Sequence, residues 1–132
     1  MLAVWHQPRF SSGPHGSSAR PIALLQRLYR SGADLVVNGH DHLYERFAPA
    51  RPDGALDREY GIRQITAGTG GGPLYGFSEP FGPNSKVRGS GSHGVLRFVL
   101  DEGRYTWEFL PVAGDTFTDE GAGECHGSPP PK

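Results

Sequence analysis

Two histidines separated by one residue, His40 and His42, are the side chains with the clearest potential for chemistry. They follow the apolar residues 35–37 and an Asn-Gly pair, so a buried strand should break into a loop just before them. In an extended backbone both imidazoles would lie on one side, with Cα atoms roughly 6.5 Å apart and Asp41 on the other side. That spacing suits one imidazole on each of two metal ions about 3.5–4 Å apart. The alternative is a pair of surface histidines flanking a turn.

A third histidine, His6, ends another short apolar segment, residues 2–5. A helix is predicted over residues 21–31, because apolar side chains recur there at helical spacing and Gly32 can end it. Strand, helix and strand in this order are typical of a βαβ unit, in which the carboxyl ends of parallel strands meet at one edge of the sheet. We therefore expect His6 to lie near His40.

The rest of the sequence favours strands. Alternating apolar residues predict a hairpin, with Tyr105, Trp107 and Phe109 facing the core. Single strands are predicted before it, and residues 73–93 read as a long irregular loop. The predicted strands cover residues 43–48, 61–67, 95–100 and 104–110.

Two segments look like loops without chemistry. The glycine-rich residues 68–72 lack the Lys-Ser/Thr of a phosphate-binding loop, so tight turns at positive φ are the simpler interpretation. Residues 1–112 are expected to form part of one catalytic domain, and residues 113–132 a flexible tail. The tail's carboxylates, Asp119 among them, are expected to be solvated.

Composition limits the classes of protein and partner. At 132 residues the chain has the size of one domain. A net charge of -1 provides no basic patch, so we expect no nucleic-acid partner. No apolar run approaches the roughly 18 residues of a membrane span, so we expect no membrane partner. The single cysteine, Cys125, cannot form a disulfide within the chain.

Several motifs together carry a family resemblance. They are Trp5-His6-Gln7-Pro8 with His15-Gly16, Asn38-Gly39-His40-Asp41-His42 running into Tyr44-Glu45-Arg46, Ala67-Gly68-Thr69-Gly70-Gly71, and Trp107-Glu108-Phe109. On these motifs the chain resembles the C-terminal half of a calcineurin-like metallophosphoesterase, of the purple acid phosphatase-like branch. This resemblance implies an α/β fold, namely the C-terminal half of an αββα sandwich with a C-terminal antiparallel hairpin.

The resemblance also implies an activity, the metal-dependent hydrolysis of a phosphorylated small molecule or another phosphoester. His6 and His40 would bind one metal ion and His42 a second, the ions being divalent or trivalent Fe, Zn or Mn. His15 would be catalytic, touching the substrate phosphate and donating a proton to the leaving oxygen. Neutral imidazole binds these metals, and two ions together can activate water and stabilise an in-line displacement. Residues 44–46 are expected to brace the loop.

The family's other metal-binding motifs, Asp-x-His, Gly-Asp and Gly-Asn-His, belong upstream of His6, which only five residues precede. One ion would then have two protein ligands and the other one, whereas catalytic zinc sites usually keep three. We therefore expect a fragment whose missing N-terminal half carries the other ligands. A partial core should leave apolar surface uncovered near Leu2, Val4, Leu35 and Val37.

The alternative is a truncated, catalytically inactive chain with weak metal binding. A third interpretation is a metal-binding module of unrelated fold. The sequence leaves open the substrate, the metal identity, the oligomeric state and the localisation, and secretion is expected only if the full-length protein carries a signal peptide.

Overall fold

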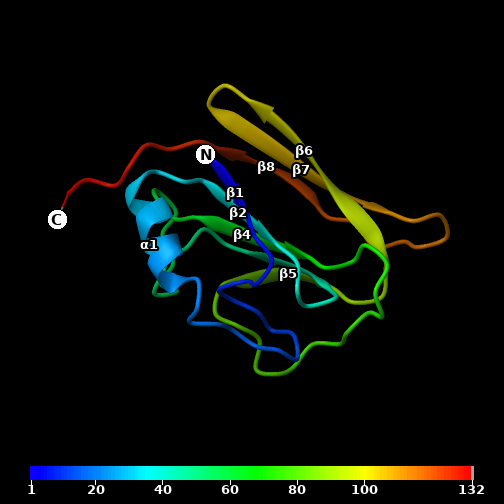
Figure 1. Ribbon diagram of the computed structural model, residues 1–132. Helices are drawn as coiled ribbons and strands as arrows, with labels where there is room; N and C mark the ends of the chain where they lie inside the picture. Colours follow the sequence, from blue (N-terminus) through cyan, green and yellow to red (C-terminus); the bar gives the residue numbers. More distant parts are fainter. Residues whose placement is uncertain (132) are drawn as a thin grey trace.

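The computed structural model describes residues 1–131, which form two β-sheets and a helix (Figure 1). The predicted α/β fold with a C-terminal antiparallel hairpin is confirmed. The elements are β1 (Leu2–Val4), α1 (Ile22–Arg30), β2 (Leu35–Asn38), β3 (Tyr44–Phe47), β4 (Arg63–Ala67), β5 (Ser85–Gly89), β6 (Gly94–Asp101), β7 (Arg104–Pro111) and β8 (Glu120–Glu124).

The first sheet has five strands in the order β1-β2-β4-β3-β5. β1, β2 and β4 run parallel, with Leu2 opposite Leu35 and Leu35 opposite Arg63. β3 is antiparallel to both β4 and β5. The predicted βαβ unit is therefore present, and the carboxyl ends of β1 and β2 meet at one edge of the sheet.

Helix α1 forms because its apolar residues share one face. Leu25 is buried against Val36 and Ile62, on one side of the five-stranded sheet. Arg27 and Arg30 lie in the last turn, where positive charge stabilises the carbonyl end of a helix, and Gly32 continues the chain at φ 73°. Among residues 1–131, no helix has the length and apolar character needed to cross a membrane.

The second sheet is the antiparallel meander β6-β7-β8, which lies over the opposite face of the first sheet (Figure 1). Its inner residues Tyr105, Trp107 and Phe109 pack against Leu35 and Ile65. Alternation explains the two interfaces, because Leu35 faces the second sheet while its neighbour Val36 faces α1.

This packing corrects the expectation of uncovered apolar surface. Leu35 is buried, and Leu2 and Val37 pack against the core that the second sheet completes. Val4 is the exception: it lies at the end of the edge strand β1 and is 71% exposed. The three-stranded sheet thus supplies the cover that the sequence alone did not reveal.

Two strands lie where the sequence predicted none. β5 falls inside the stretch read as an irregular loop, and β8 falls inside residues 113–132. The glycines of β8 are required by its neighbour, since a Cβ at Gly121 would overlap the Trp107 ring and one at Gly123 the Tyr105 ring. The domain boundary at residue 112 stays a prediction.

The expectation that the carboxylates of this segment are solvated is wrong for Asp119. It is buried and accepts hydrogen bonds from Tyr44, Arg46 and Trp107. A composition rich in Gly, Asp and Glu indicated a tail because it has no apolar pattern. The partners that bury Asp119 come from distant strands, so no local pattern could reveal them.

Candidate metal centre

The ends of β1 and β2 bring His6 and His40 together, as predicted. His6 Nε2 lies 3.2 Å from His40 Nδ1, and the ring centroids are 5.1 Å apart. The backbone holds this contact, because Gly39 N donates to His6 O at 3.0 Å in continuation of the parallel pairing. That these histidines bind metal stays a prediction.

The backbone around His40 differs from the extended geometry expected from the sequence. Residues 40–43 bend, and His40 adopts a φ of 72°, in the left-handed region that non-glycine residues rarely occupy. The inferred Cα spacing of His40 and His42 therefore does not apply. Asp41 still differs from its two neighbours in burial, as expected from its place on the other side of the chain. It is fully buried, whereas both histidines are partly exposed.

The imidazole of His15 joins the group from the loop between β1 and α1. Its centroid lies 4.5 Å from that of His40, and its Nδ1 lies 2.6 Å from Asp41 Oδ1. Ser11 Oγ also donates to the Asp41 carboxylate, and a Cβ at Gly13 would collide with it. The sequence did not predict this role for Asp41.

Glu45 ties the same loop to the sheet, in agreement with the bracing expected of residues 44–46. It is fully buried and accepts hydrogen bonds from Ser12 N at 2.8 Å and Ser12 Oγ at 2.6 Å. Ser85 Oγ of β5 donates to it at 2.6 Å. The loop that carries His15 is thereby fixed to β3 and β5.

The glycine-rich loop after β4 approaches the histidines closely. A Cβ at Gly68 would overlap the carbonyl oxygen of Asp41, and one at Gly72 would meet the His42 ring. Among the glycines of residues 68–72, the positive φ expected of tight turns occurs at Gly71, where φ is 135°. Close approach therefore explains Gly68 and Gly72 better than turn geometry does.

The electrostatic environment favours a neutral His40. Burial lowers the pKa of this imidazole below its ordinary value of 6.5, and the neighbouring His15 lowers the pKa further. The carboxylate of Asp41 acts in the opposite direction without reversing the shift. The neutral form is the one that binds metal ions.

The donor geometry of His6 and His40 fits a shared metal ion. Two nitrogen ligands of one tetrahedral ion, each about 2.0–2.1 Å from it, lie about 3.3 Å apart. The observed separation of His6 Nε2 and His40 Nδ1 is 3.2 Å. Within residues 1–131, however, no group of three His, Cys, Asp or Glu side chains is placed to hold a metal ion.

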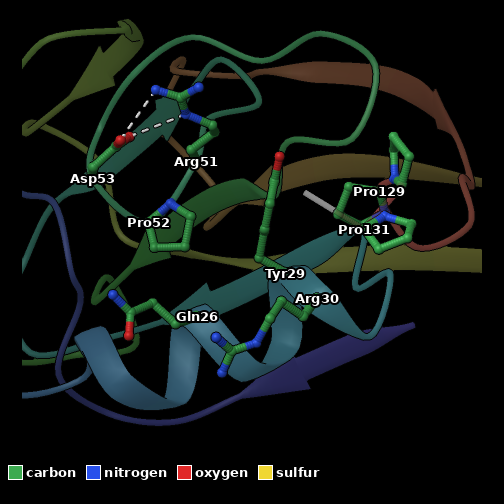
Figure 2. Close-up of a pocket in the computed structure, with 9 residues that line it drawn as sticks. Gln26, Tyr29, Arg30, Arg51, Pro52, Asp53, Pro129 and Pro131 are labelled. Carbon is green, nitrogen blue, oxygen red and sulfur yellow. Dashed lines mark hydrogen bonds and ion pairs between the residues drawn. The ribbon is translucent and has the colours of Figure 1, made fainter.

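A cavity of about 650 Å³ lies elsewhere, between α1, residues 51–53 and residues 129–131 (Figure 2). Tyr29 and Arg30 of α1 line it, and the Arg51 guanidinium is paired with Asp53 at 3.1 Å. Its lining includes none of the four histidines named above.

The chain is similar in sequence to two plant proteins. It is 36% identical over 121 residues to Purple acid phosphatase 21 of Arabidopsis thaliana, covering 83% of this chain and 26% of the relative. It is 33% identical over 116 residues to Purple acid phosphatase 22 of the same plant, covering 81% and 25%. The chain thus spans about a quarter of the length of these relatives. No family model matches it.

Solved structures share the fold. The purple acid phosphatase PPD1 from yellow lupin (Lupinus luteus) seeds matches with a TM-score of 0.76 and 20% identity, over 92% of this chain and 24% of that one. GAP50, described as the anchor in the inner membrane complex of Plasmodium, matches with a TM-score of 0.71 and 22% identity, over 97% and 36%. At these identities the likenesses establish the fold alone.

Proposed function

This chain belongs to the purple acid phosphatase-like branch of the calcineurin-like metallophosphoesterases, whose C-terminal portion it matches, and from that premise we propose that it takes part in phosphoester hydrolysis. His6 Nε2 and His40 Nδ1 would hold one metal ion, and His42 would hold a second. Such a pair of ions would neutralise phosphate charge and activate water. The ions would be Fe, Zn or Mn by the family resemblance, and imidazole ligands suit Fe and Zn among these.

One observation carries the proposal most directly. The 3.2 Å separation of His6 Nε2 and His40 Nδ1 equals, within about 0.2 Å, the separation expected of two nitrogen ligands on one ion. The same distance also allows an N–H···N hydrogen bond between the two imidazoles when no ion is bound, so the proposal rests on this geometry together with the likeness to purple acid phosphatases. The lowered pKa of His40 favours the same role, because it leaves the imidazole neutral.

His15 would act on the substrate from beside the metal ions. Asp41 Oδ1 lies 2.6 Å from its Nδ1, so that nitrogen carries a hydrogen and Nε2 is the one free to meet a phosphate oxygen. A protonated His15 could then give a proton to the leaving oxygen. Its imidazole side chain is 46% exposed, which leaves it accessible to a substrate.

The remaining ligands would come from outside this chain. The described residues contain no three-ligand group, whereas catalytic zinc sites usually keep three protein ligands. The matched relatives are about four times as long as the aligned part, which is ample for a segment that carries such ligands. The isolated chain is therefore expected to bind metal weakly and to release no phosphate.

Metal binding is tested by titrating the chain with Co²⁺, whose visible absorption changes when protein side chains replace water as its ligands. We expect His6→Ala and His40→Ala each to weaken binding at least tenfold, or about 1.4 kcal/mol. The double variant should lose little more than either single variant, because the two imidazoles share one ion. His126→Ala, which removes a histidine that contacts Gly61 instead, is the matched control.

Activity is tested in a chimera, in which this chain replaces the matching segment of Arabidopsis Purple acid phosphatase 21. We expect it to release phosphate from an aryl phosphate, and His40→Ala to reduce the rate by about two orders of magnitude, or roughly 3 kcal/mol. A folded chimera that neither retains two metal ions nor releases phosphate would favour the alternative, an inactive chain with weak metal binding.

A further inference from the structure

His42 makes a hydrogen bond that decides which of its nitrogens is available. Its Nδ1 lies 2.9 Å from the carbonyl oxygen of Pro73. A carbonyl oxygen can only accept, so Nδ1 must carry the hydrogen when the imidazole is neutral. The lone pair then resides on Nε2, which faces away from Pro73.

The same short segment fixes the plane of the ring. Tyr75 stacks on His42 with centroids 4.5 Å apart and an interplanar angle of 14°. Tyr75 N also donates to the carbonyl oxygen of His42 at 2.8 Å. The ring also lies close to Gly72, where a Cβ would be 2.7 Å from His42 Cε1. We call residues 72–75 the strap.

The strap is also held by His93, the residue that precedes β6. His93 Nε2 lies 3.0 Å from the carbonyl oxygen of Gly72. Asp115 holds the other end of that histidine residue, since its Oδ2 accepts from His93 N at 2.9 Å. Contacts with His42 and with His93 therefore restrain the strap from two separate segments of the chain.

We propose that the strap is a positioning device, which holds His42 in the Nδ1–H tautomer and orients Nε2 as its metal-binding nitrogen. The inference rests on the proposed function only for the role of His42 as a ligand. Histidines that bind metals commonly donate their second ring N–H to a carbonyl or carboxylate, and loss of that partner weakens metal binding or activity about 10- to 100-fold. Tyr75 and Pro73 are thus positioning residues, and they act through His42.

The test uses the whole metal-free chain, labelled with ¹⁵N-histidine, at a pH near 8, above the ordinary histidine pKa of about 6.5. Long-range ¹H–¹⁵N correlation spectra distinguish the two tautomers, and His42→Ala assigns the signal. We expect the wild-type chain to show His42 mainly as Nδ1–H. Tyr75→Ala should move most of the population to Nε2–H, the tautomer that free imidazole side chains favour.

Matched variants separate positioning from general structural damage. Tyr75→Phe keeps the stacked ring and should retain the wild-type tautomer, and Phe77→Ala, whose ring packs on Phe81, should also leave it unchanged. If Tyr75→Ala unfolds, His93→Ala loosens the strap from a distance and should shift the same signal. A wild-type Nε2–H tautomer, or one that no strap variant changes, would overturn the proposal whether or not Co²⁺ binds at His6 and His40.

Discussion

At the scale of single residues, the carboxylate of Asp41 orients the His15 imidazole. It is fully buried, and it faces His15 Nδ1 at 2.6 Å while Ser11 Oγ donates to its other oxygen. A buried carboxylate with two partners in a fixed loop holds an imidazole in one orientation. Its place between His40 and His42 would make it the link between the proposed metal ions and His15, the imidazole that we propose to be catalytic.

Asp41→Asn in the chimera should therefore lower kcat about 10- to 100-fold and change KM much less. The amide can donate a hydrogen bond as well as accept one, so it no longer requires Nδ1–H on His15. Steady-state hydrolysis of an aryl phosphate measures both constants.

Asp53→Asn is the control for that experiment, since Asp53 is paired with Arg51 on the surface and lies outside the group of histidines. It should leave both constants unchanged. Equal effects of the two substitutions, or an unchanged kcat for Asp41→Asn, would show that Asp41 does not act through His15.

Single residues were predictable where topology alone places them. His6 and His40 follow strands that lie side by side, so their convergence could be derived from the order of elements. The spacing inferred for His42 failed because His40 adopts a positive φ that no residue pattern announces. The contacts of Asp41 and Tyr75 arise between irregular loops, whose conformation depends on distant partners.

Among the elements, the loop after β4 packs closely against the backbone of residues 40–43, which carries His40 and His42. Gly68→Ala would push a methyl group into the backbone carbonyl of Asp41. Because the clash is with backbone, no rotation of a side chain can relieve it. We expect the free energy of unfolding to fall by about 1–3 kcal/mol, the range for overpacked sites. Urea unfolding followed by tryptophan fluorescence measures this loss.

Gly70→Ala, two residues later in the same loop, is the control. A Cβ there meets nothing within 4 Å, and its φ lies outside the left-handed region. The substitution should change stability by less than about 0.5 kcal/mol, as at other surface sites. Similar losses for both variants would mean that the loop resists any substitution, without a particular contact at Gly68.

Strand β8, which was not predicted from the sequence, shows that a strand can form without an apolar pattern of its own. β8 reads Glu-Gly-Ala-Gly-Glu, which lacks the apolar alternation that identifies a strand. It forms because the edge of β7 that is not paired with β6 can pair with it. Gly121 and Gly123 also leave room for the rings of Trp107 and Tyr105. β6 and β7, by contrast, alternate regularly and were predicted almost to their ends.

For the whole molecule, the polar cluster around Asp119 joins the two sheets. Its carboxylate accepts from Tyr44 Oη at 2.6 Å and Arg46 Nε at 2.7 Å on the first sheet, and from Trp107 Nε1 at 3.0 Å on the second. Arg46 also lies over the Trp107 ring, 5.0 Å from its centroid. A buried charge with this many partners is costly to disturb.

Asp119→Ala should lower the free energy of unfolding by about 3–5 kcal/mol, because it leaves the Arg46 guanidinium without its buried partner. Chemical denaturation measures the loss. Asp101→Ala removes a carboxylate from an exposed pair with Arg104 and should cost at most about 1 kcal/mol. If the two losses are equal, the cluster does not hold the sheets together.

Stability should also depend on pH through Asp119. Burial disfavours its charged form, but hydrogen bonds from Arg46, Tyr44 and Trp107 outweigh this, so its pKa lies below the usual 3.8. A carboxyl with a lowered folded-state pKa adds stability above its unfolded pKa and loses that contribution as pH falls through the folded value.

We therefore expect the wild-type chain to lose stability as pH decreases below about 4, and Asp119→Ala to lose less over the same range. Denaturation at several pH values compares the two slopes. Parallel slopes would contradict the lowered pKa.

At this scale, the fold class and the family could be predicted because short motifs and strand order are properties of the sequence itself. The aromatic residues of β7 were also predicted to face the core, but their packing on Leu35 could not be predicted, since no local pattern shows which strands two sheets bring together.

The link between Tyr44 and Asp119 has a consequence for the order of folding. It spans 75 residues of chain, so closing it costs more entropy than forming the β6–β7 hairpin, and contacts of this separation slow folding. Docking of the sheets should therefore follow formation of the hairpin. Removing the Asp119 carboxylate should leave the refolding rate nearly unchanged and accelerate unfolding, as stopped-flow kinetics would record.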